Sequence, residues 1–121
     1  MNRVLYIEDN PANLRLVQKM LERIPGIDLY SATNAEMGIE LARSKLPSLI
    51  LMDINLPGMN GYQALIVLRD DELTSEIPVI ALSANAMTHD IKRGELEDFD
   101  KYLTKPFDIS EFLKVVDEVV G

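Results

Sequence analysis

The sequence predicts an α/β fold in which helices cover both faces of a five-stranded parallel sheet. Five short aliphatic or β-branched runs alternate along the chain with segments of helical periodicity. The runs are mostly continuous stretches of apolar residues, which is typical of strands that are buried on both faces. With 121 residues, 47% of them hydrophobic, the chain is expected to form one folded domain over residues 1–121.

The apolar runs are expected to form the strands, and right-handed crossovers are expected to join them. Their length of a few residues suits strands better than helices. The runs are Val4–Ile7, Ile27–Ala32, Ser48–Met52, Pro78–Leu82 and Lys101–Leu103.

Capping residues mark the first two helices. Asn10 is a good N-cap and Pro11 suits the first helical position, whereas the pair Pro25–Gly26 is expected to end this helix. Asn34 is expected to cap the second helix, and the inner stripe of that helix is expected to reach Leu46.

Three more helices are expected further along the chain. The third follows Asn60, and the fourth, over roughly Met87–Glu97, has the weakest apolar pattern and contains a glycine. The last opens at Asp108, with Glu111 three residues later in the spacing of a capping box. Its apolar stripe comprises Ile109, Phe112, Leu113, Val116 and Val120.

Composition excludes several classes of protein. Acidic residues outnumber basic ones 20 to 12, and the net charge of −8 argues against direct binding of nucleic acid. Cysteine is absent, which excludes a disulfide framework and a cysteine-based zinc site. No apolar run approaches the length of a membrane span, and the N-terminus lacks the apolar core of a signal peptide. We therefore expect a cytoplasmic chain with no membrane span.

Polar or charged residues that could bind a ligand or take part in a reaction follow four of the expected strands. Glu8 and Asp9 follow the first strand, Asp53 the third, Ser83 the fourth and Lys105 the fifth. In sheets of this kind ligands bind outside the carboxyl ends of the strands. Taken singly, each residue reads as a solvated loop residue or a helix cap. Their joint occurrence at four strand ends favours a common site.

If the first and third strands are neighbours, the three carboxylates converge. Uncompensated, they would repel one another. A hard divalent cation with oxygen ligands relieves that repulsion, and Mg²⁺ is the natural candidate. Lys105 adds a positive charge and Ser83 a hydroxyl, so the set is suited to holding a phosphoryl group beside a carboxylate nucleophile.

These residues, in this order and at these separations, resemble the receiver domain of response regulators in two-component signalling. The resemblance covers essentially the whole chain. It rests on the Glu8–Asp9 pair, on "LILMDINLPGMNG" around Asp53, on "IPVIALSAN" ending near Ser83, and on "YLTKPF" with Lys105.

The resemblance implies a flavodoxin-like three-layer fold with strand order 2-1-3-4-5. It also implies that Asp53 accepts a phosphoryl group from the phosphohistidine of a histidine kinase or a phosphotransfer protein. Asp9, Asp53 and the backbone carbonyl of Asn55 would be ligands of Mg²⁺, for which Mn²⁺ could substitute, with Glu8 in the outer sphere.

Further implied roles concern the phosphoryl group and the output. Ser83 and Lys105 would contact the phosphoryl oxygens, and Tyr102 would change rotamer together with Ser83. The Lys105–Pro106 bond would be cis, a geometry that only an X-Pro bond adopts cheaply. Phosphorylation of Asp53 would then change the surface formed by the fourth helix, the fifth strand and the fifth helix.

The chain departs from the family pattern at two positions. Glu8 stands where many relatives have Asp, which adds one methylene to the metal site. Asp98 stands where relatives often have the Gly that ends the fourth helix, and this puts the boundary of that helix in question.

Other classes fit the sequence less well. A hydrolase with an aspartyl nucleophile would carry a second acid two residues after Asp53, where this chain has Asn55. A phosphorylation-independent interaction module that kept the fold would be expected to have lost part of the site. We therefore expect a phosphoacceptor and not an enzyme with its own small-molecule substrate. The run "ALSANAM" resembles receivers fused to hybrid sensor kinases, which favours a piece of a larger protein over a stand-alone regulator.

Overall fold

A computed structural model describes residues 2–83, 99–104 and 109–120 of the chain, and shows a five-stranded parallel sheet at its centre. The strand order is β2-β1-β3-β4-β5, as the family resemblance implied. The strands are β1 (Asn2–Ile7), β2 (Ile27–Ala32), β3 (Leu49–Asp53), β4 (Val79–Ser83) and β5 (Lys101–Thr104).

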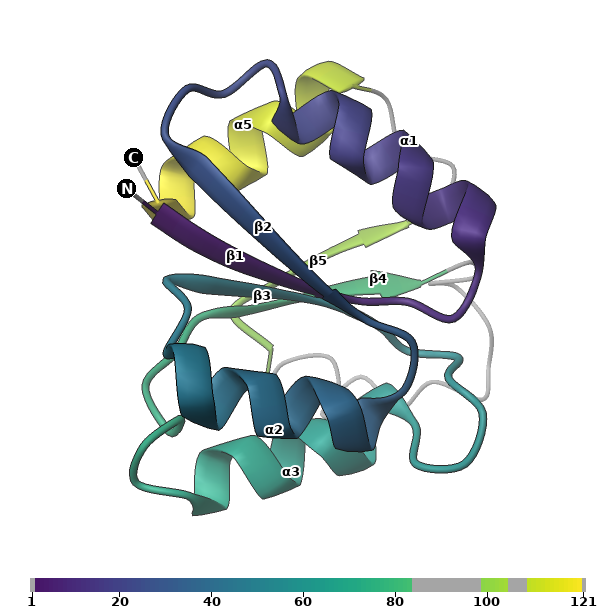
Figure 1. Ribbon diagram of the computed structural model, residues 1–121, viewed down its shortest axis with the longest axis vertical. Helices are drawn as coiled ribbons and strands as arrows, with labels where there is room; N and C mark the ends of the chain where they lie inside the picture. Colours follow the sequence, from purple (N-terminus) through teal and green to yellow (C-terminus); the bar gives the residue numbers. More distant parts are fainter. Residues whose placement is uncertain (1, 84–98, 105–108, 121) are drawn as a thin grey trace.

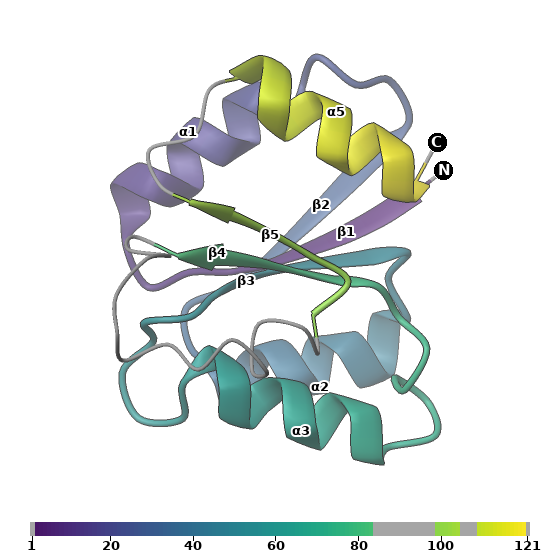
Figure 2. The ribbon, with the colours of Figure 1, turned by 180° about the vertical axis from the view of Figure 1, so that it is seen from behind.

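Helices cover both faces of this sheet (Figures 1 and 2). On one face lie α1 (Pro11–Leu21) and α5 (Ile109–Val120). On the other lie α2 (Ala35–Lys45) and α3 (Gly61–Asp70). The predicted three-layer arrangement is therefore confirmed for the described part of the chain. The expected fourth helix, including Asp98, lies outside the described residues.

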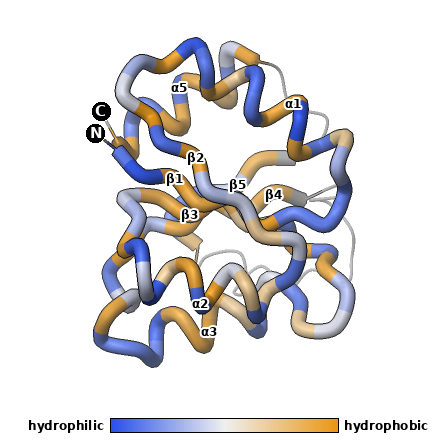
Figure 3. Tube along the Cα trace, in the orientation of Figure 1, coloured by the Kyte–Doolittle hydropathy of each residue, from blue (hydrophilic) through white to orange (hydrophobic). Residues whose placement is uncertain are grey.

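Two hydrophobic clusters, one on each face, fill the space between the sheet and the helices. All five residues of β3 are buried, and hydrophobic residues dominate the inner strands (Figure 3). Along β1 the side chains alternate: Leu5 and Ile7 join the cluster beneath α2 and α3, whereas Val4 and Tyr6 join the cluster beneath α1 and α5. This alternation decides which residues share a face at the end of the strand.

The predicted caps are present at three helix starts. The side chain of Asn10 accepts hydrogen bonds from the backbone N–H groups of the first turn of α1, and Asn34 does the same for α2. Asn60 forms a full capping box with Gln63, each side chain accepting from the other's backbone N–H at 3.0 Å. The expected cap at Asp108 lies outside the described residues.

The predicted end of α1 was wrong by one turn. The helix ends at Leu21, four residues before Pro25. Because a proline disfavours the helical conformation of the residue before it, the chain leaves the helix through a tighter turn, in which the N–H of Ile24 donates to the carbonyl of Leu21 at 3.0 Å.

Two residues predicted to face inward are exposed. Leu46 ends α2 in the left-handed conformation, with φ 47°, ahead of Pro47, and this turn directs its side chain to solvent. Ile109 is exposed as the first residue of α5, one turn before the buried positions Phe112 and Val116 of the same helix.

One arginine ties the end of α3 to the strands that follow it. Arg69 donates from Nη1 to the carbonyls of Ser75 and Ile77, at 3.0 and 2.7 Å, and its Nη2 lies 2.8 Å from Oδ2 of Asp100. The same carboxylate oxygen accepts from the N–H of Val79 at 2.7 Å. The start of β4 and the segment before β5 are therefore held together by side chains that periodicity does not reveal.

Candidate functional site

Three carboxylates meet at the carboxyl ends of two neighbouring strands. Glu8, Asp9 and Asp53 each place an oxygen within 4.8 Å of the other two. Strand register explains why: Ile7 of β1 pairs with Met52 of β3, so Glu8 and Asp53 are the next residues of two adjacent parallel strands. The predicted convergence of these three acids is confirmed.

The three acids differ in their surroundings. Glu8 and Asp53 are 1% and 5% exposed, whereas Asp9 is exposed to solvent. Burying carboxylates side by side is unfavourable unless other groups compensate their charge. A hard cation with oxygen ligands suits this set, because it accepts carboxylates and retains water on its open side.

Backbone hydrogen bonds fix the position of Asp53. The N–H of Asn55 donates to Oδ1 of Asp53 at 3.1 Å, and the N–H of Ile54 donates to the carbonyl of Leu82 in β4 at 3.0 Å. The N–H of Gly61 closes the loop by donating to the carbonyl of Ile54 at 3.0 Å. Asp53 therefore stands at the rim of the core on a backbone tied to both neighbouring elements.

Gly61 allows α3 to begin directly against this strand end. A Cβ at this position would lie 2.9 Å from the carbonyl oxygen of Asp53 and 2.9 Å from the Cα of Ile54. Both are backbone atoms, which cannot move aside as a flexible side chain can. The absence of a side chain at Gly61 thus sets how closely the helix approaches the candidate site.

Glu8 is held by a tyrosine that the sequence reasoning did not single out. The hydroxyl of Tyr6 donates to Oε1 of Glu8 at 2.8 Å, and the N–H of Asn10 makes a longer contact of 3.5 Å with Oε2. Burial, with the nearby Glu8 carboxylate, raises the pKa of Tyr6, so the phenol remains a donor. A signal was present in the sequence: residues two apart on a strand share a face, and a buried tyrosine hydroxyl needs a partner.

The remaining predicted site residues are only partly described. The backbone of Ser83 ends β4 and pairs with Thr104 of β5, which places Ser83 at the same sheet edge as the acids. The side chain of Ser83, together with Lys105 and Pro106, lies outside the described residues. Tyr102 lies on β5 with 48% of its surface exposed. Their expected roles stay predictions.

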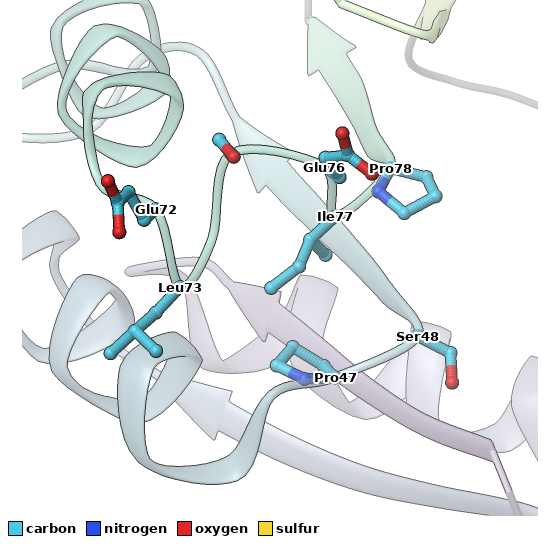
Figure 4. A pocket seen from close by; sticks show the side chains of 8 residues that line it. Pro47, Ser48, Glu72, Leu73, Glu76, Ile77 and Pro78 are labelled. Atoms are coloured by element: carbon cyan, nitrogen blue, oxygen red, sulfur yellow. The ribbon is translucent and has the colours of Figure 1, made fainter.

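A cavity of about 440 Å³ lies at the opposite edge of the sheet (Figure 4). Its lining comes from the segments before β3 and β4, including Pro47, Glu72, Glu76 and Pro78. Because ligands of parallel sheets bind at the carboxyl ends of the strands, this cavity is not the counterpart of the acidic site.

Among the described residues, no helix has both the length and the apolar composition that a membrane crossing requires.

A five-stranded doubly wound sheet with three acids at its switch point is the arrangement expected above for a receiver domain. A family model, the response regulator receiver domain, matches residues 4–117. The chain therefore belongs to the response regulator receiver family. It is a phosphoacceptor of two-component signalling and not a conventional enzyme, and a histidine kinase is the partner that such a domain implies.

Similar proteins are found over nearly the whole chain. Protein PilH of Pseudomonas aeruginosa is 38% identical over 121 residues, which cover 100% of this chain and 99% of PilH. The polar-differentiation response regulator DivK of Brucella anthropi is 34% identical over 118 residues, covering 98% of this chain and 95% of DivK.

Solved structures show the same fold. The receiver domain of the sensor histidine kinase PA1611 from Pseudomonas aeruginosa PAO1 has a TM-score of 0.89 and 31% identity, covering 99% of this chain and 98% of that domain. That structure has a magnesium ion coordinated in its active-site cleft. The chemotaxis protein CheY4 of Vibrio cholerae has a TM-score of 0.87 at 23% identity, covering 99% of both chains, and supports the fold alone.

Proposed function

We propose that Asp53 is the phosphoacceptor of a single receiver domain that spans residues 1–121. The observation that carries this proposal is the meeting of Glu8, Asp9 and Asp53 within 4.8 Å at the carboxyl ends of β1 and β3. Asp53 ends a strand whose backbone is tied to β4 and to the start of α3, as a residue that must meet an incoming group requires. Asp9 is exposed, and Glu8 is already engaged by Tyr6.

In the proposed step, a carboxylate oxygen of Asp53 attacks the phosphorus of a phosphohistidine. A new P–O bond forms, the P–N bond breaks, and the histidine leaves with the electron pair of that bond. The donor belongs to a histidine kinase or to a phosphotransfer protein. Negative charge accumulates on the phosphoryl oxygens beside three carboxylates, so the transfer requires positive charge in the site.

We assign the metal to Asp9, Asp53 and the backbone carbonyl of Asn55, with Glu8 in its outer sphere. The donor set fits Mg²⁺ because it is made of oxygen atoms and includes one exposed carboxylate that leaves room for water. Bound Mg²⁺, or Mn²⁺ in its place, supplies positive charge next to the transferred group. The magnesium ion in the active-site cleft of the PA1611 receiver supports a metal at this place in the fold.

The finer roles follow the family resemblance. In this proposal Ser83 and Lys105 would contact the phosphoryl oxygens, the bond before Pro106 would be cis, and Tyr102 would respond to Ser83. The output is a change in the surface that contains β5 and α5. The protein acts in the cytoplasm, and with a net charge of −8 it makes no direct contact with nucleic acid.

Intact mass spectrometry after incubation with acetyl phosphate tests the proposal. With Mg²⁺ the wild type should gain the mass of one phosphoryl group, and in EDTA it should gain none. Asp53→Asn should gain none in either condition, whereas Asp28→Asn, which changes an acid on β2, should behave like the wild type. Reduction with borohydride and peptide mapping should then locate the modified residue.

Stoichiometric labelling of Asp53→Asn would refute the assignment of the phosphoacceptor. Labelling of the wild type that is as fast in EDTA as in Mg²⁺ would refute the assignment of the metal. Failure of the wild type to label under any condition would favour a phosphorylation-independent interaction module.

A further inference from the structure

The hydroxyl of Tyr6 is a neutral donor placed inside a cluster of negative charge. Tyr6 is fully buried, and its hydroxyl donates to Oε1 of Glu8 at 2.8 Å in a hydrogen bond that is itself buried. A hydrogen bond to an ionised acceptor is roughly twice as strong as one between neutral groups. The proposed mechanism gives this tyrosine no role.

Strand geometry explains why this pair can form. Tyr6 and Glu8 are two residues apart, and Tyr6 packs in the cluster beneath α1 and α5, so both side chains project from the same face of β1. Asp53, the next residue of the neighbouring strand, stands beside Glu8. The tyrosine ring lies in the core, and its hydroxyl reaches the carboxylate from the core side.

Because its side chain is longer than that of aspartate, Glu8 needs a hydrogen bond that fixes the position of its carboxylate. A glutamate has one methylene and one torsion more than an aspartate, so its carboxylate has more positions open to it. In a cluster this small, the position of the Glu8 carboxylate sets how strongly it repels Asp53 and Asp9. A donor on the core side restricts the carboxylate to one position without adding a charge.

We propose that Tyr6 is a positioning residue for the metal site, which holds the Glu8 carboxylate on the core side so that Asp9 and Asp53 remain the direct ligands. This role rests on the proposed function. It acts through Glu8, in the way that hydrogen-bonded outer groups orient the ligands of metal sites in general.

Titration of Mg²⁺ into the protein by calorimetry, with no phosphoryl donor present, tests this role. Tyr6→Phe removes the hydroxyl and keeps the ring, so the core packing is retained. It should weaken Mg²⁺ binding by up to about tenfold, the lower end of the range for partners of direct ligands, because Tyr6 bonds a carboxylate of the outer sphere. Tyr30→Phe is the matched control, because Tyr30 also donates to an acid two residues away, Asp28 on β2, at 3.2 Å. Its Mg²⁺ affinity should equal that of the wild type.

A double-mutant cycle separates positioning from a purely structural effect. In Glu8→Asp the shorter carboxylate no longer reaches the Tyr6 hydroxyl, so adding Tyr6→Phe should leave the Mg²⁺ affinity unchanged. A general disturbance of the core would instead weaken binding equally in both backgrounds. In the wild type, the slowly exchanging proton of the Tyr6 hydroxyl should also shift in NMR spectra when Mg²⁺ is added.

The outcomes distinguish this inference from the proposed function. If the wild type binds no Mg²⁺, the proposed metal site fails and the role of Tyr6 fails with it. If the wild type binds Mg²⁺ and Tyr6→Phe binds it equally well, the positioning role alone is overturned. An equal loss in the two backgrounds of Glu8, or a hydroxyl proton that does not respond to Mg²⁺, would also overturn it.

Discussion

Removing the charge of Asp53 should stabilise the protein when no divalent cation is present. Asp53→Asn keeps the size and shape of the side chain, and its amide oxygen can still accept the N–H of Asn55, which now donates at 3.1 Å. The change removes the repulsion between this carboxylate and its two acidic neighbours. A protein optimised for stability would not place these groups together, so stability is sacrificed here for the site.

The expected gain follows from the separation of the charges. At the 4.8 Å limit between carboxylate oxygens, two unit charges repel by about 0.9 kcal/mol in bulk water and about 3.5 kcal/mol at an effective dielectric constant of 20. The Asp53–Glu8 pair is buried and tends toward the second value, whereas Asp9 is exposed and tends toward the first. Because other charges of the site offset part of this repulsion, we expect a net gain of about 1 to 3 kcal/mol.

Urea unfolding followed by circular dichroism measures this gain. In EDTA, Asp53→Asn should have the higher midpoint, and Asp9→Asn should gain less, because its charge is screened by solvent. Saturating Mg²⁺ should stabilise the wild type, by about 2.7 kcal/mol at a hundred times the Kd, and should leave Asp53→Asn almost unchanged. If Asp53→Asn unfolds at or below the wild-type midpoint in EDTA, the repulsion argument is wrong.

Three further changes test other parts of the structure. Gly61→Ala should destabilise by about 1 to 3 kcal/mol and weaken Mg²⁺ binding, because its Cβ would press on backbone at the end of β3; urea melts and calorimetry decide this. Asn60→Ala should cost about 1 kcal/mol, since the Gln63 N–H loses the side-chain oxygen to which it donates, and an unchanged urea midpoint would contradict this. The hydrogen bond and charge of Lys101 lower the pKa of Glu118, so this pair stabilises above the ordinary pKa of a glutamate and the contribution is lost as the pH falls. At low salt, the melting temperature of Glu118→Gln should therefore fall less steeply on acidification than that of the wild type. Parallel curves of melting temperature against pH would show that the Lys101–Glu118 pair makes no such contribution.

Local signals in the sequence predicted the elements and their starts. Asn10, Asn34 and Asn60 cap helices as expected, because a cap depends on a side chain and the few backbone groups beside it. Helix ends were less predictable. Pro25 and Pro47 limit how far α1 and α2 can extend, but the last residue of each helix also depends on how the chain reaches the next strand.

The sequence by itself determined the alternation of strands and helices, the burial of the strands and the presence of acids at their ends. These follow from hydrophobic periodicity and from the cost of placing a charge inside a buried strand. Only the tertiary structure decided the register that sets Glu8 beside Asp53, and that the Tyr6 hydroxyl reaches Glu8. It also decided that Gly61 meets the backbone of Asp53. Contacts of this kind depend on register and on close packing between distant segments, and these are fixed only when the whole core assembles.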